Sequence, residues 1–229
     1  MKKIFLIIFI IIFTSNFILA QLSGGYTLYN LGDDKSIKCN VSLYKDGTYE
    51  ITLDENTAED IVESILISIG TYLYKNGEIT LIDNYHGYKM IFIDQKCCIL
   101  AKKSFQWMQN KKFIKTNSDF IKSIYFKIKF KPLKQERADF KKLYKEKFNL
   151  NYGVYENEVG FSINFLSDNK YKFEYRKIIL SEGTFKKNEN ELVLFDTALN
   201  YPFYVFIKKN VLISKLLPED YEGNTFKKK

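Results

Sequence analysis

Histidine is the side chain that most often serves as a general base, and this chain contains one, His86. It stands in Asn84-Tyr85-His86-Gly87, a segment whose composition is typical of a turn. A serine or cysteine nucleophile activated by histidine would have to be built on this residue. No sequence motif places such a nucleophile beside it, so we interpret His86 as a surface turn residue without a catalytic role.

Cysteine could supply a metal site or a disulfide, and the chain contains Cys39, Cys97 and Cys98. Adjacent Cys97 and Cys98 on a strand would point to opposite faces, so they do not form a metal-binding pair. In an exported protein, a bridge from Cys39 to Cys97 or to Cys98 would close a loop of about 60 residues and contribute up to ~4 kcal/mol. Three reduced thiols are the other interpretation, and both stay open.

Paired carboxylates could carry out acid–base chemistry. Asp83 and Asp196 stand in similar sequence surroundings, as do Glu78 and Glu191. All four fall at predicted strand ends and turns, and two separate barrels would keep Asp83 and Asp196 apart. The chain also lacks a glycine-rich phosphate loop and a nucleotide motif. We therefore predict a non-catalytic protein without a metal or cofactor site.

Charge is the strongest chemical signal. Residues 102–147 hold 15 Lys or Arg and 4 Asp or Glu, a net charge of +11, with aromatic residues between them. Basic residues interleaved with aromatic ones can bind anionic polymers or membrane surfaces. The candidate contact residues are Lys127, Lys129, Lys131, Arg137, Lys141, Lys142 and Lys145. The interpretation that we favour is a solvated face whose lysine stems cover apolar surface.

The first 20 residues have the order of a secretory signal. Met1-Lys2-Lys3 is basic, Ile4 to Phe13 is an apolar run, and the segment ends in the small residue Ala20. The run is shorter than the ~20 residues of a membrane-spanning helix. We expect cleavage after residue 20, no membrane span in the mature chain, and export to the periplasm, the cell surface or the medium.

The rest of the chain repeats itself. Gly70-Thr71-Tyr72 returns as Gly183-Thr184-Phe185, and Glu78 to Asp83 returns at the same spacing as Glu191 to Asp196. A repeat of this size is typical of one supersecondary unit used twice.

Each copy contains short alternating strands separated by tight turns. Ile37 to Leu43 alternates apolar and polar residues, and Asp46-Gly47 follows as a hairpin turn. Ile124 to Phe130 alternates most regularly, so we expect a strand with one buried face. With 17% aromatic residues and seven or eight candidate strands per copy, the sequence predicts an all-β fold of two tandem antiparallel meanders or small barrels.

The segment between the copies breaks this pattern. Apolar residues from Leu133 to Phe148 recur at near-helical spacing with lysines between them, which predicts a basic amphipathic helix. A short helix or a longer loop is expected at 57–60, where the first copy is longer than the second. The resulting domains are a signal at 1–20, a first meander at 21–131, a helical connector at 132–149 and a second meander at 150–229.

Four motifs of the first copy resemble lipocalin-like meanders of exported bacterial proteins. They are Gly24-Gly25-Tyr26, Asp46-Gly47-Thr48-Tyr49, Gly70-Thr71-Tyr72 and Asn76 to Leu81. The resemblance rests on turn chemistry and strand alternation. It implies a small barrel that binds an apolar ligand, and it transfers no binding residues.

The predicted function is that of an exported, non-catalytic protein that binds a small apolar ligand or an envelope component. The alternative is a structural or interaction protein of the cell envelope, with filled barrels and a basic surface for anionic polymers or membranes. Nucleic acid is not an expected partner. A well-formed apolar pocket of ~300 Å³ or more would favour the first function, and interiors filled by Phe and Tyr the second.

Overall fold

The computed structural model describes residues 22–31, 36–56, 62–116, 122–127, 133–143, 150–189, 191–208, 211–214 and 225–229. The strands of the first repeat are β1 (Gly24–Leu31), β2 (Ile37–Leu43), β3 (Thr48–Asn56), β4 (Val62–Lys75), β5 (Glu78–Asp83), β6 (Lys89–Asp94), β7 (Cys98–Lys103) and β8 (Lys112–Thr116). Those of the second are β9 (Gly153–Glu156), β10 (Phe161–Phe165), β11 (Lys170–Tyr175), β12 (Ile178–Asn188), β13 (Glu191–Asp196), β14 (Tyr201–Lys208), β15 (Val211–Ser214) and β16 (Thr225–Lys228). The helical elements are η1 (Gln106–Met108), η2 (Ile124–Lys127) and α2 (Leu133–Leu143).

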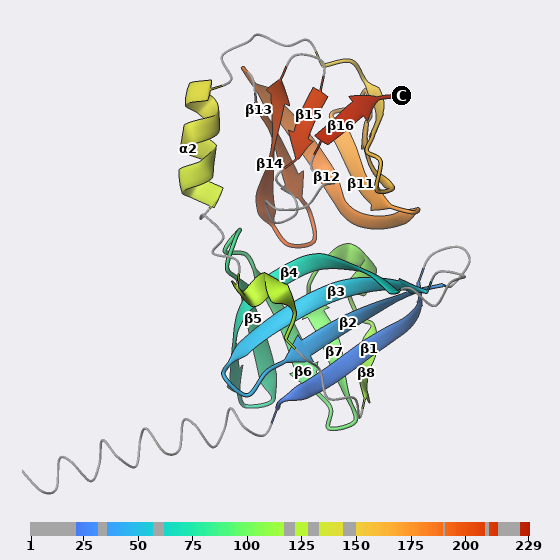
Figure 1. The fold of residues 1–229 in the computed structure, drawn as a ribbon, viewed down its shortest axis with the longest axis vertical. Helices are drawn as coiled ribbons and strands as arrows, with labels where there is room; N and C mark the ends of the chain where they lie inside the picture. Colours follow the sequence, from blue (N-terminus) through green and yellow to red (C-terminus); the bar gives the residue numbers. More distant parts are fainter. Residues whose placement is uncertain are drawn as a thin grey trace, which may run out of the picture.

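Strands β1 to β8 close one antiparallel barrel, and β9 to β16 close a second (Figure 1). Each strand pairs with its neighbour in the chain, and the last strand of each barrel pairs with the first, β8 with β1 and β16 with β9. The predicted all-β fold with two repeated units is confirmed, and the two copies form separate barrels.

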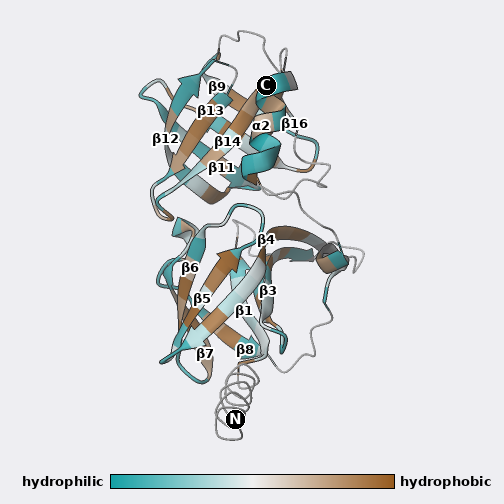
Figure 2. Ribbon diagram, turned by 90° about the vertical axis from the view of Figure 1, so that its left-hand side faces the viewer, coloured by the Kyte–Doolittle hydropathy of each residue, from teal (hydrophilic) through white to brown (hydrophobic). Residues whose placement is uncertain are grey.

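Aromatic side chains fill both interiors. The strands alternate buried and less buried residues, as in β10 and β11, and Figure 2 shows apolar residues along the strands of both barrels. Inside the second barrel, the Phe161 ring stacks on Phe173 with a centroid separation of 5.5 Å. The largest fully buried side chains are all Tyr or Phe: Tyr26, Tyr49, Tyr72, Tyr85, Tyr155, Tyr171, Tyr175, Phe92, Phe113, Phe161, Phe165 and Phe203.

A row of three residues crosses strands β3, β4 and β5 of the first barrel. Tyr49 pairs with Gly70, and Gly70 pairs with Asp83. A Cβ atom on Gly70 would lie 2.0 Å from the carbonyl oxygen of Ile82 and 3.0 Å from the Tyr49 ring. The close approach of the neighbouring backbone therefore requires glycine at this position.

The second barrel repeats the row on β11, β12 and β13. Tyr171 pairs with Gly183, and Gly183 pairs with Asp196. A Cβ atom on Gly183 would again lie 2.0 Å from a backbone oxygen, that of Phe195. The Gly-Thr dipeptide of the repeat thus marks the same close strand contact in each barrel.

The two barrels meet through the turn between β5 and β6 and the start of β14. The Tyr201 hydroxyl donates a hydrogen bond of 2.6 Å to the backbone oxygen of His86. The ring of Tyr88 lies 5.7 Å from that of Tyr201 and 6.0 Å from that of Phe203. Buried residues of both barrels belong to one contiguous hydrophobic cluster, so the barrels share a packed joint.

The long hairpin of β3 and β4 also reaches the second barrel. Buried Glu55 accepts a hydrogen bond of 3.2 Å from the Tyr175 hydroxyl and forms an ion pair with Arg176. The helix or loop expected at 57–60, near the tip of this hairpin, lies outside the described residues.

Helix α2 matches the predicted connector helix as far as residue 143, and 144–149 lie outside the described residues. It contacts both barrels. Buried Glu136 accepts a hydrogen bond of 2.5 Å from the Tyr85 hydroxyl of the first barrel, and Phe140 stacks at 4.8 Å on Phe206 of the second. Within the described part of the chain, every helix is too short or too polar to cross a membrane.

The predicted strand at 124–130 is wrong over the part that the structure describes. Residues 124–127 form the 3-10 helix η2, and 128–130 lie outside the described residues. The strand that closes the first barrel is β8, which the alternation pattern did not reveal. A closed barrel has no free edge for another strand. The ring of Phe126 in η2 packs edge-on against the ring of Tyr44, which lies between β2 and β3, with ring centres 5.4 Å apart.

We predict that Gly70→Ala destabilises the protein by at least ~2 kcal/mol, because the new methyl group would collide with backbone atoms that cannot move independently. Gly77→Ala is the matched control, since its Cβ would meet open space although φ is +80°, and it should cost about 1 kcal/mol. Urea unfolding compares the two variants. Equal losses of stability in both would contradict the account of the Gly70 contact.

Candidate functional site

A chain of hydrogen bonds runs through the first barrel from Tyr49 to Asp83. The Tyr49 hydroxyl lies 2.7 Å from the hydroxyl of Ser68, which donates to a carboxylate oxygen of Asp83 at 2.7 Å. Because the Ser68 proton is committed to the carboxylate, Tyr49 is the donor in the first bond. The other carboxylate oxygen accepts the backbone N–H groups of Tyr85 and His86 at 2.9 and 2.6 Å.

The second barrel contains the same chain of hydrogen bonds. Tyr171 and Ser181 are joined at 2.6 Å, Ser181 donates to Asp196 at 2.6 Å, and Asp196 accepts the backbone N–H of Leu199 at 2.7 Å. Burial raises the pKa of the Asp196 carboxyl above its ordinary value, although the hydrogen bonds from Leu199 and Ser181 oppose this shift.

These serine–aspartate pairs hold turns together and do not form a nucleophilic site. Ser68 and Ser181 are buried, and each hydroxyl donates to its carboxylate without an intervening base. In this hydrogen-bond network, His86 donates its backbone N–H to Asp83. The centre of its ring lies 5.1 Å from that of the Phe203 ring, in the joint between the barrels. The predicted turn at His86 is confirmed, but its predicted surface position is wrong, because the ring packs against Tyr88 and Phe203 in the joint.

The three cysteines are free thiols, so the candidate disulfide is absent from the structure. Cys39 is buried on β2, Cys98 is buried on β7, and Cys97 is exposed in the turn before it. Strands β1 and β8 lie between β2 and β7, which separates these strands by roughly 14 Å at the usual strand spacing, beyond disulfide reach. Among the described residues, no three His, Cys, Asp or Glu side chains gather as a metal site.

Two members of the predicted basic surface pair with one buried carboxylate, although the Lys141 side chain remains 48% exposed. Arg137 and Lys141 on α2 bind the carboxylate of Glu191 at 2.5 and 3.1 Å, and that carboxylate is fully buried. The hydrogen bond to Glu191 raises the pKa of Arg137. Of the remaining candidates, Lys127 and Lys142 are exposed, and Lys129, Lys131 and Lys145 lie outside the described residues.

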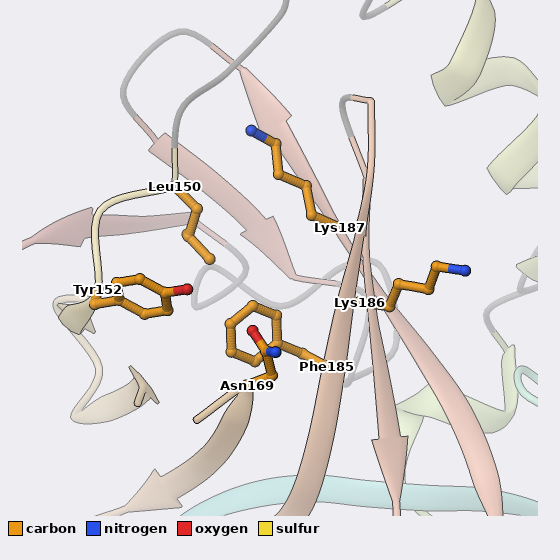
Figure 3. A pocket seen from close by; sticks show the side chains of 6 residues that line it. All are labelled: Leu150, Tyr152, Asn169, Phe185, Lys186 and Lys187. Carbon is orange, nitrogen blue, oxygen red and sulfur yellow. The ribbon is translucent and has the colours of Figure 1, made fainter. Parts of the chain in front are cut away.

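A hollow of about 420 Å³ opens at the end of the second barrel that faces away from the first barrel (Figure 3). It lies beside the turn between β10 and β11 and the last part of β12, at the opposite end of the strands from the β13–β14 turn in the joint. We call it the mouth of the second barrel. The lining residues are Leu150, Tyr152, Asn169, Phe185, Lys186 and Lys187.

The mouth has an aromatic floor and an exposed aromatic wall. Phe185 is buried and packs edge-on against Phe165 at 5.0 Å, and Phe165 in turn packs against Tyr155 at 5.8 Å. Tyr152 is 52% exposed, and its ring lies 6.4 Å from that of Phe185. The rings beneath Phe185 close the barrel, so the mouth can hold a group on its surface but not deep inside.

The first barrel carries two hydrogen-bonded tyrosines at the equivalent end. Tyr72 stands where the second barrel has Phe185, and its hydroxyl donates to a backbone oxygen in the β2–β3 turn at 3.0 Å. Tyr74 stands in place of Lys187 and donates to Asp94 at 3.1 Å. The strand and turn patterns did not predict the mouth. The repeat nevertheless contains a sequence difference that points to it, because the second copy has Phe185 and Lys187 where the first has Tyr72 and Tyr74.

No protein-family model matches the chain, and no curated protein or solved structure matches it.

The raised pKa of Asp196 predicts a pH effect on stability. The folded state holds this proton more tightly than the unfolded state, so the contribution of Asp196 falls as pH rises from its ordinary pKa of 3.8 through the folded pKa. Asp196→Asn keeps the acceptor for Leu199 and removes the titration. The free energy of unfolding of the native protein, minus that of the variant, should decrease across this window. A difference that is constant or rises with pH would refute this account.

Proposed function

We propose that the protein is an exported, non-catalytic binding protein. Its two filled barrels act as a scaffold, and the mouth of the second barrel holds a small, partly apolar ligand. This proposal keeps the binding role predicted from the sequence, but it moves the ligand from the barrel interior to one end.

The observation that carries the proposal is that the second barrel has a filled interior and, at one end, an open hollow with an aromatic floor. Ligand sites usually are hollows of ~300–1,000 Å³ lined by apolar and aromatic groups with a few polar ones, and the mouth measures about 420 Å³. Tyr152, Phe185 and Leu150 supply apolar surface, and the Asn169 amide supplies hydrogen-bonding groups. A ligand seated there would remove the exposed Tyr152 ring from water.

The filled interiors of both barrels agree with the alternative of a structural or interaction protein, but the broad basic surface predicted with that alternative has less support. Its helix supplies Arg137 and Lys141 to a buried carboxylate, and those charges serve the contact between α2 and the second barrel. Binding of anionic polymers would then depend on the other cations of the basic segment, among them the exposed Lys127 and Lys142.

Export rests on the basic and apolar order of residues 1–20. We expect the mature protein from bacteria that produce the full chain to lie outside the cytoplasm and to begin at Gln21, as N-terminal sequencing would show. Ile8→Lys interrupts the apolar run and should leave the full-length chain in the cytoplasm. A native chain that keeps Met1 and stays in the cytoplasm would contradict export.

Binding at the mouth can be tested with the neutral fluorescent probe N-phenyl-1-naphthylamine. Tyr152→Ala should weaken its binding roughly two- to tenfold, the range expected for one lost aromatic contact. Tyr29→Ala in the first barrel is the matched control, because Tyr29 is 53% exposed and Tyr152 is 52% exposed. If the probe does not bind, or if both variants weaken it equally, the mouth is not the binding site.

A further inference from the structure

Residues 122–127, which include η2 and which we call the docked segment, lie against the outer face of the first barrel (Figure 1). The hydroxyl of Ser123 donates a hydrogen bond of 2.6 Å to the carboxylate of Glu50 on β3. Three residues after Ser123, the ring of Phe126 packs edge-on against the ring of Tyr44. Although Glu50 faces outward by strand alternation, it is buried, as is Tyr44. The segment therefore docks through a hydroxyl group and an aromatic ring.

The repeat places an equivalent groove on the second barrel. Tyr44 and Leu166 each donate their backbone N–H to the first residue of the strand that follows. Glu50 pairs with Ile69 across β3 and β4, next to the glycine of the repeat, and Lys172 pairs with Glu182 at the same place across β11 and β12. The matched residues are Tyr44 and Leu166, Glu50 and Lys172, and Ile69 and Glu182.

The groove of the second barrel is open. Its volume is about 310 Å³, and its lining includes Leu166, Lys172 and Glu182, with Gln106 of η1 at its border. These three side chains of the second barrel are half-buried, whereas all of their counterparts in the first barrel are buried. None of the residues that line the groove also lines the mouth, so the two are separate surfaces.

The groove offers an apolar contact beside two opposite charges. Leu166 can pack against an aromatic ring at the place where Tyr44 packs against Phe126. A hydroxyl group both donates and accepts hydrogen bonds. One serine or threonine side chain can therefore accept from Lys172 and donate to Glu182.

The ligand does not need to supply a cation. In the first barrel, Asp46 forms an ion pair with Lys122 of the docked segment. Its counterpart in the second barrel, Asp168, forms an ion pair with Lys170 of the same barrel. The charge that the docked segment brings to the first barrel is thus already present in the second.

Exposed aromatic surface lies next to the groove. Phe195 on β13 pairs with Thr184, a lining residue, and its side chain is 42% exposed. Aromatic side chains are enriched in protein–protein interfaces. A segment that leaves the groove across β13 would remove this ring from water.

We propose that this groove docks a short segment of a partner protein, in which an aromatic residue follows a serine or threonine by three positions. The aromatic ring packs on Leu166, and the hydroxyl group bridges Lys172 and Glu182. The spacing is that of Ser123 and Phe126 in the docked segment. The proposal concerns a surface other than the mouth, so it holds or fails independently of ligand binding there.

The test uses the full mature protein, isotope-labelled, and an acetylated and amidated peptide with the sequence of residues 122–127, Lys-Ser-Ile-Tyr-Phe-Lys. The peptide should shift the backbone amide NMR signals of Leu166, of Lys170 to Lys172 and of Glu182 to Thr184. The same peptide with Phe126→Ala should bind about five- to twentyfold more weakly, the range for one lost aromatic contact.

A pair of protein variants locates the contact. Leu166→Ser removes the apolar partner of the ring and should weaken peptide binding about three- to tenfold. Leu150→Ser is the matched control, because this leucine is also half-buried but lines the mouth, and it should leave peptide binding unchanged. The comparison of the two peptides on the native protein decides the matter even if Leu166→Ser does not fold.

The outcomes are distinct. Shifts confined to the groove, weakened by Phe126→Ala in the peptide and by Leu166→Ser in the protein, support the docking site. Absence of shifts, or shifts centred on the mouth or on the first barrel, overturns it. Equal binding of the two peptides also overturns it, because the aromatic ring then contributes nothing. Groove signals that move with protein concentration alone indicate a second copy as the occupant and overturn the partner segment.

Discussion

A tyrosine that pairs across strands with a glycine, and whose hydroxyl is linked through a serine to a buried aspartate, stands at the same place in each barrel. The glycine lets the neighbouring strand approach so closely that a methyl group would meet its carbonyl oxygen at 2.0 Å. The aspartate then holds the next turn by accepting its backbone N–H groups. One row of residues therefore sets the strand contact, fills the interior and shapes the turns, including the β5–β6 turn that meets the second barrel.

The joint between the barrels depends on this row because the turns held by Asp83 and Asp196 lead into it. His86 lies in the first turn and Tyr88 follows it, and Tyr201 and Phe203 follow the second turn. Helix α2 adds a contact to each barrel, and its cations neutralise a buried glutamate. With one end of the second barrel packed in the joint, its other end remains open for a ligand. The repeat thus provides two scaffolds, and the far end of the second one carries Phe185 and Lys187 where the first carries Tyr72 and Tyr74.

Much of the fold could be predicted from the sequence, because strand alternation, hairpin turns and the repeat are local patterns. The strand predicted at 124–130 failed for a non-local reason, since β8 had already closed the barrel. Likewise, the helical spacing of Arg137 and Lys141 predicts an exposed basic face. In the structure both side chains bind Glu191 of β13, which is more than forty residues away in the chain. The mouth depends on three separate segments coming together, so only the changes from Tyr72 to Phe185 and from Tyr74 to Lys187 pointed toward it.

The central claim is that ligand binds at the mouth of a filled barrel. Backbone amide NMR shifts of the isotope-labelled mature protein, recorded during a titration with N-phenyl-1-naphthylamine, test it most directly. The account predicts that the shifts that change cluster at Leu150 to Gly153, at Asn169 and at Phe185 to Lys187, while those of the first barrel stay fixed. Changes centred instead on the inner residues of β10 and β11, or on the first barrel, would contradict it.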